Sequence, residues 1–571
     1  MHRATPDTKT TPWKPFLFVG LLLFFVVNLL QAVFTEINAD EAYYFLYGEH
    51  LAWGYFDHPP MVGLMTFVSH ALFNGNLSVR FVTVLLSLLT CIVLWKSLDE
   101  NHPDKHKVWV FLTLLFSVVM FNIYGFITTP DSALLFFSAL FFLEYKRYLN
   151  DNNLKTSLWI GVLMAAMIYS KYHALLLLAL VVLSNLSLLK DKRFWLSCAV
   201  TALLLVPHLV WQVENDFPSF KYHLMQRSTP FQWSFLLEYL PNQLLVFNPF
   251  TFGAMVYVLF RYKPDDRFER ALFFSIVGFL VFFAFMTFRG HVEPHWTMVC
   301  MIPTILLLYK HTLNDPKLLR YTKRFILPSL LLIVAMRVLL LTPLSSRFGF
   351  YGNKAYYQAI EKVAEDRPVV FNSSYQEPSL YHYHTGKATS TLRSAWLRTT
   401  QYDLLQMDRD FIGRPVFLCA PWGQTQEFHV DDTVFRGLFA NHYLAANRLN
   451  INAKIAGFDS KIPPVFHYGD TITVDFSIEN TLDTVIPFTD NNFSILLYAL
   501  YENGYKFREC HHETITEIKG KSVVNGRLWT LVDPKIPAGK QRFTICIRDV
   551  YTFYDNDACY YDTFIEESTA H

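Results

Sequence analysis

Charged residues are scarce in this chain of 571 residues. Asp, Glu, Lys and Arg make up 17% of it, against about 25% in soluble domains, whereas 52% of the residues are hydrophobic and 53 are Phe. The formal net charge is +1, so no bulk positive charge indicates a nucleic-acid partner. This composition is unlike that of a soluble enzyme and is typical of a protein that crosses a membrane several times.

Three sequence patterns are also missing. The chain has seven Cys but no Cys-x-x-Cys pair, which argues against a zinc ribbon. No Gly-rich phosphate loop is visible, so no nucleotide cofactor is expected. No repeat with a period of about 20–50 residues occurs, which argues against a solenoid.

Long apolar runs are abundant and predict membrane spans. A spanning helix needs about 20 apolar residues, and several of these runs are only just long enough. We expect about 11–13 spans within residues 15–342, and we expect the shorter run 61–73 to lie on the membrane surface. The runs are 16–34, 80–97, 108–127, 132–149, 157–170, 173–189, 195–213, 239–260, 271–288, 295–309 and 325–342.

The distribution of Lys and Arg predicts the orientation. These residues gather in alternate short loops and in the tail 1–14, whereas the first loop, residues 35–79, contains none. Basic residues are enriched in cytoplasmic loops of membrane proteins. We therefore expect the tail 1–14 in the cytoplasm, and the loop 35–79 and the C-terminal region outside.

The C-terminal region reads as two modules. Residues 343–448 alternate helix-like and strand-like segments, which predicts a small α/β module. Residues 449–571 contain short alternating strands separated by Gly- and Asn-containing turns, which predicts a β-sandwich. Whether this sandwich docks an acceptor or only packs on the α/β module stays open.

Polar and charged side chains of the outer loops are predicted to meet at one membrane face. A carboxylate there can remove a hydroxyl proton, and cations can stabilise a departing phosphate. This combination suits transfer of a group from a lipid phosphate to an acceptor hydroxyl. The residues are Asp40, Glu41, Tyr44, Tyr55, Asp57, His58, Asp131, Lys171, Tyr172, His223, Arg227 and Arg289.

Each of these residues also has a structural explanation. Asp40 and Glu41 are residue types that favour the start of a helix. Lys171 is placed to extend along a helix end towards the interface. His223 and Arg227 are spaced as on one solvated helix face. The functional interpretation depends on their occurrence together on one side of the membrane.

The order of these motifs resembles a known family. Asp40-Glu41, then Tyr55-Phe-Asp-His-Pro-Pro60, Asp131 and Ser170-Lys-Tyr172 are similar to motifs of the GT-C polyprenyl-phosphate-sugar transferases. The resemblance is to the bacterial branch related to protein O-mannosyltransferases and aminoarabinose–lipid A transferases. It implies a multi-pass enzyme of the bacterial inner membrane, with a periplasmic C-terminal domain.

The resemblance also implies roles for residues. Asp40 corresponds to the catalytic base, with Glu41 as its catalytic neighbour. Asp57 and His223 correspond to ligands of a divalent metal ion. Contact with the donor phosphate or substrate is implied for Tyr44, Tyr55, His58, Asp131, Lys171, Tyr172, Arg227 and Arg289.

The implied reaction is an inverting transfer of a sugar from a polyprenyl-phosphate donor, bound among membrane lipids, to an extracytoplasmic acceptor. Lipid A, another glycolipid, a glycan and a protein are all compatible acceptors. A transporter for polyprenyl-linked lipids is one alternative, although such proteins carry ionisable groups near the bilayer midplane. A membrane scaffold that binds glycans without catalysis is the other.

Overall fold

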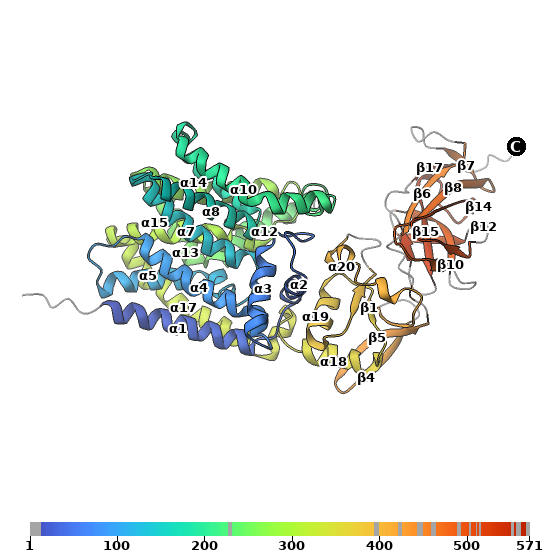
Figure 1. Cartoon of the computed structure of the whole chain (residues 1–571), viewed down its shortest axis with the longest axis horizontal. Helices are drawn as coiled ribbons and strands as arrows, with labels where there is room; N and C mark the ends of the chain where they lie inside the picture. The colour runs from blue at the N-terminus through green and yellow to red at the C-terminus, as the bar shows by residue number, and fades with distance from the viewer. Residues whose placement is uncertain are drawn as a thin grey trace, which may run out of the picture. The chain divides into compact units, whose positions relative to one another are not determined.

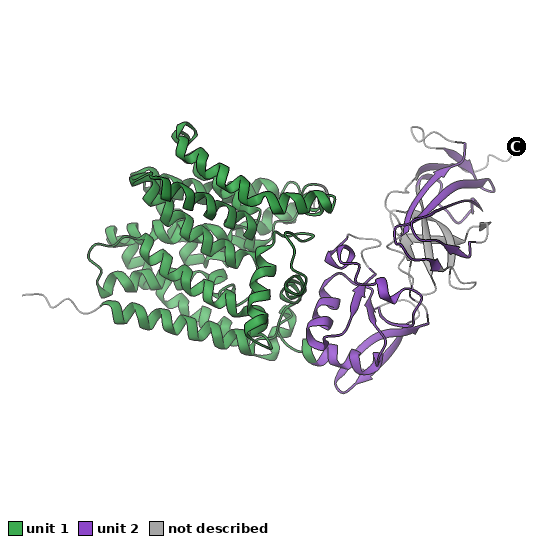
Figure 2. Ribbon diagram, in the orientation of Figure 1, with its two compact units in different colours: residues 1–354 green, residues 355–571 purple. Residues whose placement is uncertain are grey.

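The computed structural model describes most of the chain, in two compact units. The described residues are 13–226, 231–392, 399–420, 425–441, 443, 449–457, 464–487, 493–501, 504–509, 511–512, 515–549, 553–555 and 561–566. The units are Met1–Lys354 and Ala355–His571 (Figure 2).

Unit 1 is helical (Figure 1). Its α-helices are α1 (Trp13–Phe34), α2 (Ala39–Glu49), α3 (Met61–Leu72), α4 (Leu77–Ser97), α5 (Lys105–Ser117), α6 (Val119–Ile123), α7 (Pro130–Asn150), α8 (Leu154–Ser170), α9 (His173–Ser184), α10 (Lys192–Glu214), α11 (Pro218–Lys221), α12 (Trp233–Phe247), α13 (Pro249–Arg261), α14 (Arg267–Met286), α15 (Met301–Asn314), α16 (Pro316–Tyr321) and α17 (Leu327–Leu339). Short 3₁₀ or π turns are η1 (Leu186–Lys190), η2 (Tyr222–Gln226), η3 (Pro294–Cys300), η4 (Thr322–Ile326) and η5 (Pro343–Phe348).

The helices confirm a multi-pass membrane protein, but fewer of them than predicted qualify as single spans. Among the described residues, five are long and apolar enough: α1, α4, α10, α14 and the continuous segment Pro294–Asn314. A sixth span is possible if α12 and α13, bent by 102°, count as one. The expected 11–13 was too high by this measure because several apolar runs are interrupted. The run 108–127, for example, breaks at the extended residue Val118 (φ −74°, ψ 112°).

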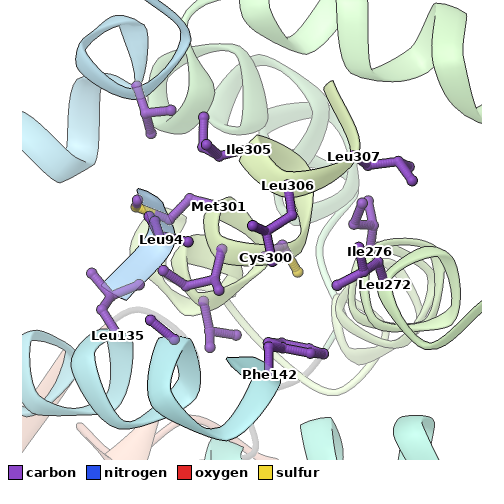
Figure 3. Packing of buried hydrophobic residues seen from close by; sticks show 14 of the residues in the cluster. Leu94, Leu135, Phe142, Leu272, Ile276, Cys300, Met301, Ile305, Leu306 and Leu307 are labelled. Carbon is purple, nitrogen blue, oxygen red and sulfur yellow. The ribbon is translucent and has the colours of Figure 1, made fainter. Parts of the chain in front are cut away.

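The core of unit 1 surrounds α15. Met301, Ile305 and Leu306 of this helix are 5% exposed or less. They belong to one cluster of buried side chains with Leu94 of α4 and Leu272 of α14, as Figure 3 shows. A helix that is apolar on nearly every side is stable only when other helices cover it. Helices α4, α5, α7, α13 and α14 pack against this centre, whereas α1 and α10 carry exposed apolar side chains, as lipid contact requires.

Two short helices cover the end of the bundle where α1 finishes (Figure 1). The backbone of α2 approaches α3 closely, because a side-chain carbon at Gly48 would lie 2.8 Å from the Phe67 nitrogen. The Thr66 hydroxyl donates to the Tyr44 carbonyl oxygen over 2.8 Å. The predicted helix 61–73 therefore exists as α3, and the pair α2–α3 fixes the first outer loop.

Unit 2 begins with helix α18 (Asn353–Ala364), whose first residues belong to unit 1, and a five-stranded sheet in the order β2-β1-β3-β5-β4. Strands β1 (Val369–Phe371), β2 (Thr389–Thr391) and β3 (Val416–Cys419) are parallel, whereas β4 (Gln426–Val430) and β5 (Thr433–Ala440) are antiparallel. Helices α19 (Gln376–Thr385) and α20 (Gln401–Leu404), and the turn η7 (Arg409–Phe411), connect the strands. This is an α/β module of the predicted kind.

The rest of unit 2 is the predicted β-sandwich. One sheet has the order β12-β14-β8-β6, the other β11-β10-β15-β17-β7 with β16 beside β15, and β13 pairs with β9. The strands are β6 (Leu449–Ile455), β7 (Val465–His467), β8 (Thr471–Asn480), β9 (Ile486–Pro487), β10 (Phe493–Tyr501), β11 (Gly504–Glu509), β12 (His511–His512), β13 (Glu517–Ile518), β14 (Val523–Leu531), β15 (Gly539–Asp549), β16 (Phe553–Asp555) and β17 (Tyr561–Glu566). One buried apolar cluster contains Val370 of the α/β module together with Val474 and Ile565 of the two sandwich sheets.

Candidate functional site

Helix α2 lies within the first outer loop, and its capped N-terminus carries Asp40. The side chain of Asn38 accepts the Glu41 backbone N–H over 3.0 Å, and the Glu41 carboxylate accepts the Asn38 N–H over 3.3 Å. This capping box fixes the start of α2. Asp40 lies between these two residues with an exposed side chain, in the helix turn where backbone N–H groups favour a negative charge.

Glu41 differs from Asp40 because its carboxylate is wholly buried. The Arg80 guanidinium donates to both carboxylate oxygens, with Nε–Oε1 at 2.6 Å and Nη2–Oε2 at 2.5 Å. The Thr128 backbone N–H donates to Oε1 over 3.0 Å. With both oxygens engaged by donors and no exposed surface, this carboxylate cannot be reached by an acceptor hydroxyl. This geometry favours a positioning role for Glu41 over the catalytic one that the resemblance implies.

Arg80 joins the first outer loop to α4. Its side chain is fully buried, and its guanidinium also donates to the carbonyl oxygens of Ala32, Thr35 and Glu36. The turn between α1 and α2 therefore wraps around one guanidinium group. Sequence reasoning missed Arg80 because it directly follows the cation-free segment 35–79 and begins an apolar run.

Asp131 and Lys171 form a second buried ion pair. The Lys171 Nζ lies 2.6 Å from Asp131 Oδ2, and the two side chains are 7% and 4% exposed. Asp131 lies in the first turn of α7, and Lys171 ends α8. The structure thus brings together two predicted site residues 40 positions apart. In this arrangement the Asp131 carboxylate balances the Lys171 charge.

Tyr124 lies where the acidic side chains converge. Its hydroxyl is within electrostatic range of Asp131, Asp40, Glu293 and Glu41. Its ring centroid is 5.9 Å from that of His295. The first outer loop, the start of α7 and the segment before η3 therefore meet at one place, as the sequence predicted. Tyr124 itself was not predicted, because it falls within the apolar run 108–127.

Tyrosines of α2 hold the Asp57-His58 segment. The Tyr47 hydroxyl donates to Asp57 Oδ1 over 2.6 Å, and the Tyr44 hydroxyl lies 3.3 Å from His58 Nε2. The Tyr55 ring stacks on Tyr47 at 4.0 Å, and its hydroxyl donates to the Tyr47 carbonyl. Burial, reinforced by the Asp57 charge, raises the pKa of Tyr47 well above its ordinary value. The Tyr47 phenol therefore stays protonated and keeps donating to Asp57.

A hydrogen-bonded chain connects this loop with α10. The Tyr172 hydroxyl lies 3.0 Å from His208 Nε2 and accepts from the Gln212 amide over 3.2 Å. The same amide lies 2.9 Å from the hydroxyl of Ser219, which donates to the Tyr55 carbonyl. His208 Nδ1 lies 2.6 Å from the Trp53 carbonyl oxygen. Since a carbonyl only accepts, Nδ1 carries the hydrogen and Nε2 accepts from Tyr172.

Asp57 and His223 are neighbours that meet through the Asp57 backbone. His223 Nε2 lies 2.9 Å from the Asp57 backbone carbonyl oxygen. A neutral His223 therefore carries its hydrogen on Nε2, so that any metal contact would be made by Nδ1. Across the described residues, no group of three or more His, Cys, Asp or Glu is arranged to hold a metal ion.

Two predicted cations are not assigned to this cluster. Arg227 lies outside the described residues. Arg289 follows α14 with an exposed side chain, and its backbone N–H donates to the Met286 carbonyl. Among the described residues, Arg80 and Lys171 are thus the cations that bond directly to these acids. Arg80 pairs with Glu41, and Lys171 pairs with Asp131.

Part of the chain is similar to known proteins. Residues 57–211 match the family model of dolichyl-phosphate-mannose-protein mannosyltransferases. The lipid A galacturonosyltransferase RgtD of Rhizobium johnstonii is 24% identical over 325 residues, covering 53% of this chain and 67% of that protein. These sequence matches favour a glycosyltransferase over a transporter or a scaffold.

One solved structure shares the fold. The crystal structure of ArnT from Cupriavidus metallidurans bound to undecaprenyl phosphate superposes with a TM-score of 0.55 at 16% identity, covering 76% of this chain and 99% of that one. The arabinosyltransferase EmbB of Mycobacterium smegmatis is matched over 99% of this chain and 65% of that one, at 10% identity and a TM-score of 0.41.

Proposed function

We propose that this chain, which is similar to glycosyltransferases in its sequence matches, transfers a sugar from a polyprenyl-phosphate donor to an extracytoplasmic acceptor with inversion. The observation that carries this proposal is the contrast among three acids. Glu41 and Asp131 are buried in ion pairs, whereas Asp40 is exposed at the start of α2. Asp40 is the one of the three that an incoming acceptor can reach.

In the proposed reaction, Asp40 accepts the proton of the acceptor hydroxyl. The acceptor oxygen attacks the anomeric carbon as the bond from that carbon to the phosphate oxygen breaks. The electron pair leaves with polyprenyl phosphate, and an acceptor that offers a phosphate oxygen needs no proton removed. Attack opposite the leaving group inverts the anomeric configuration.

The developing phosphate charge needs cations, and the loop residues supply candidates. His58, Arg227 and Arg289 are proposed to contact the donor phosphate, His58 most strongly when protonated. Tyr44 orients the His58 ring, while Tyr55 and Tyr172 hold the loop backbone through the hydrogen bonds described above. The Lys171–Asp131 pair is proposed to form the inner wall of the site.

The donor class is supported by the fold shared with a protein bound to undecaprenyl phosphate. The family match to dolichyl-phosphate-mannose enzymes points to the same chemistry. An acceptor on the outer side of the bacterial inner membrane follows from the distribution of basic residues. Lipid A is one acceptor on which the similar RgtD acts by name, and it is the first to test.

The experiment is transfer from a panel of radiolabelled polyprenyl-phosphate sugars to isolated membranes and to purified lipid A. Wild type and Asp40→Asn are compared in detergent, and the anomeric configuration of the product is determined by NMR. Label that moves only with wild type, into a product of inverted configuration, supports the proposal. Donor that binds without any transfer in the wild type would contradict it.

The same assay tests whether sugar transfer requires a divalent ion. Because no group of three or more His, Cys, Asp or Glu among the described residues is arranged to hold an ion, no step above passes through a metal. We expect transfer to continue in EDTA. A loss of transfer that Mg²⁺ or Mn²⁺ restores would show that other residues hold an ion.

A further inference from the structure

The four-stranded sheet of the sandwich has one face turned away from the core. Side chains alternate along β8, where Ile472, Val474 and Ile478 are buried and the residues between them point outward. The outward residues of β6 and β8 are polar, whereas β14 presents Asn525 and Arg527 together with the apolar Val523, Trp529 and Leu531. These three strands run side by side in Figure 1.

The strand register places the outward polar residues in rows. Asn452, Ser477 and Asn525 lie opposite one another across the three strands. The next row contains Lys454, Asp475 and Arg527. Arg527 Nε donates to Asp475 Oδ1 over 2.6 Å, with the two side chains 60% and 50% exposed. Rows of this kind set donors and acceptors at the regular spacing of the sheet.

A shallow cleft, widely open to solvent, lies over these two rows. It is lined by their six residues together with Ala453, Phe476 and Gly526. Trp529, two residues beyond Arg527 on the same face of β14, keeps 41% of its surface exposed. Amide and charged side chains therefore line the cleft, and an aromatic ring lies beside it.

We propose that this face binds a carbohydrate chain through its hydroxyl groups. Asn452 and Asn525 each offer an amide that donates and accepts, as vicinal hydroxyls do, while Arg527 and Lys454 donate and Asp475 accepts. The Trp529 ring offers an apolar surface against which the C–H face of a sugar ring packs. The site lies outside the transfer site and is independent of the proposed function.

Other ligand classes fit this face less well. The cleft holds two cations and one anion, and Glu479 with Asn450 occupies the next row, so the surplus positive charge that a nucleic acid requires is missing. An added peptide strand pairs with a sheet edge, whereas the two rows lie on the face of the sheet and centre on β8, which is paired on both sides. An apolar partner needs a contiguous apolar patch, but the outward apolar residues Val523, Trp529 and Leu531 lie towards the two ends of β14, and the rows between them are polar.

The test uses the full-length protein in nanodiscs without donor lipid. Wild type is applied to an immobilised panel of neutral and acidic bacterial surface oligosaccharides, and the strongest binder is titrated by calorimetry. The double variant Asn452→Ala/Asn525→Ala should bind at least about tenfold more weakly, since several hydrogen bonds to the ligand are lost. Lys535→Ala, an exposed change in the turn after β14, should bind like wild type.

Two further measurements keep the outcome decisive. Thermal unfolding of the double variant must match wild type, and Trp529→Ala, tested in parallel, should also weaken binding. The affinity should change little between low and high salt, because hydroxyl contacts are not screened. The proposal would be overturned if wild type bound none of the glycans. It would also be overturned if the double variant and Trp529→Ala both bound at wild-type strength. Asp40→Asn should bind the glycan normally, so a failed transfer reaction leaves this test intact.

Discussion

Asp40 and Glu41 are adjacent and chemically alike, yet their surroundings give them different capacities. The capping box turns Glu41 inward against Arg80 and leaves Asp40 exposed at the helix start. A buried, paired carboxylate stabilises the loop through its charge, whereas an exposed one can exchange a proton with a ligand. The sequence indicated that Asp40 and Glu41 belong to the site. It did not indicate which of the two faces inward, because that depends on Arg80, which lies outside the loop 35–79.

Glu41→Gln should destabilise the protein. The change leaves the buried Arg80 charge without its carboxylate, and breaking a buried pair in this way costs about 3–5 kcal/mol. Thermal unfolding in detergent measures the loss, with the exposed Glu49→Gln of the same helix as the matched control. If Glu41→Gln unfolds like wild type but fails to transfer sugar, Glu41 belongs to the catalytic group after all.

The raised pKa of Tyr47 predicts a loss of stability at alkaline pH. The unfolded chain releases the Tyr47 proton near pH 10, while the folded protein retains it, so folding loses free energy as the pH rises above about 10. Tyr47→Phe removes this dependence and should show a smaller fall in unfolding temperature between pH 8 and pH 11. An equal fall in both proteins would show that Tyr47 does not titrate differently on folding.

At the scale of elements, short helices hold the loops of the site against the long helices. The chain of hydrogen bonds from α10 through Gln212 and Ser219 reaches the backbone of Tyr55. Such contacts join segments more than 150 residues apart, so periodicity along the sequence does not reveal them. The individual helices and strands were predictable because apolar periodicity and turn residues are local features.

Tyr172→Phe should loosen the first outer loop. It removes the hydroxyl between His208 and Gln212, and leaving such buried groups without a partner costs about 1–3 kcal/mol. Hydrogen exchange should accelerate at residues 50–60. The control is Tyr257→Phe, which removes a hydroxyl bonded to Asp315 elsewhere in unit 1. Equal exchange in Tyr172→Phe and wild type would show that this chain does not hold the loop.

For the whole molecule, composition predicted the class of protein more directly than the number of single spans. Scarce charge and long apolar runs predicted a multi-pass protein with two C-terminal modules, and the structure has these parts. Five helices of the described residues qualify as single spans by length and composition, or six with the bent pair α12–α13, and breaks such as those at Val118 and Asn248 interrupt other apolar runs. The residues that link loops, among them Tyr124, Arg80 and His208, lie inside or beside apolar runs and carry no loop signal.

The orientation is a prediction at this scale. The positive-inside pattern places residues 1–14 in the cytoplasm and the C-terminal unit outside. Alkaline phosphatase, which is active only outside the cytoplasm, should be active when fused after residue 571 and inactive when it replaces the chain after α4. The reverse pattern would place Asp40 on the cytoplasmic side.

The central claim is that Asp40 accepts the acceptor proton during sugar transfer. Its most direct test is the turnover of purified Asp40→Asn with saturating donor and acceptor, alongside donor binding measured separately. We predict that turnover falls by about 10²–10⁴-fold, the usual contribution of a general base, while donor affinity and unfolding temperature match wild type. Turnover within a few-fold of wild type would contradict the account and require another group to accept the proton.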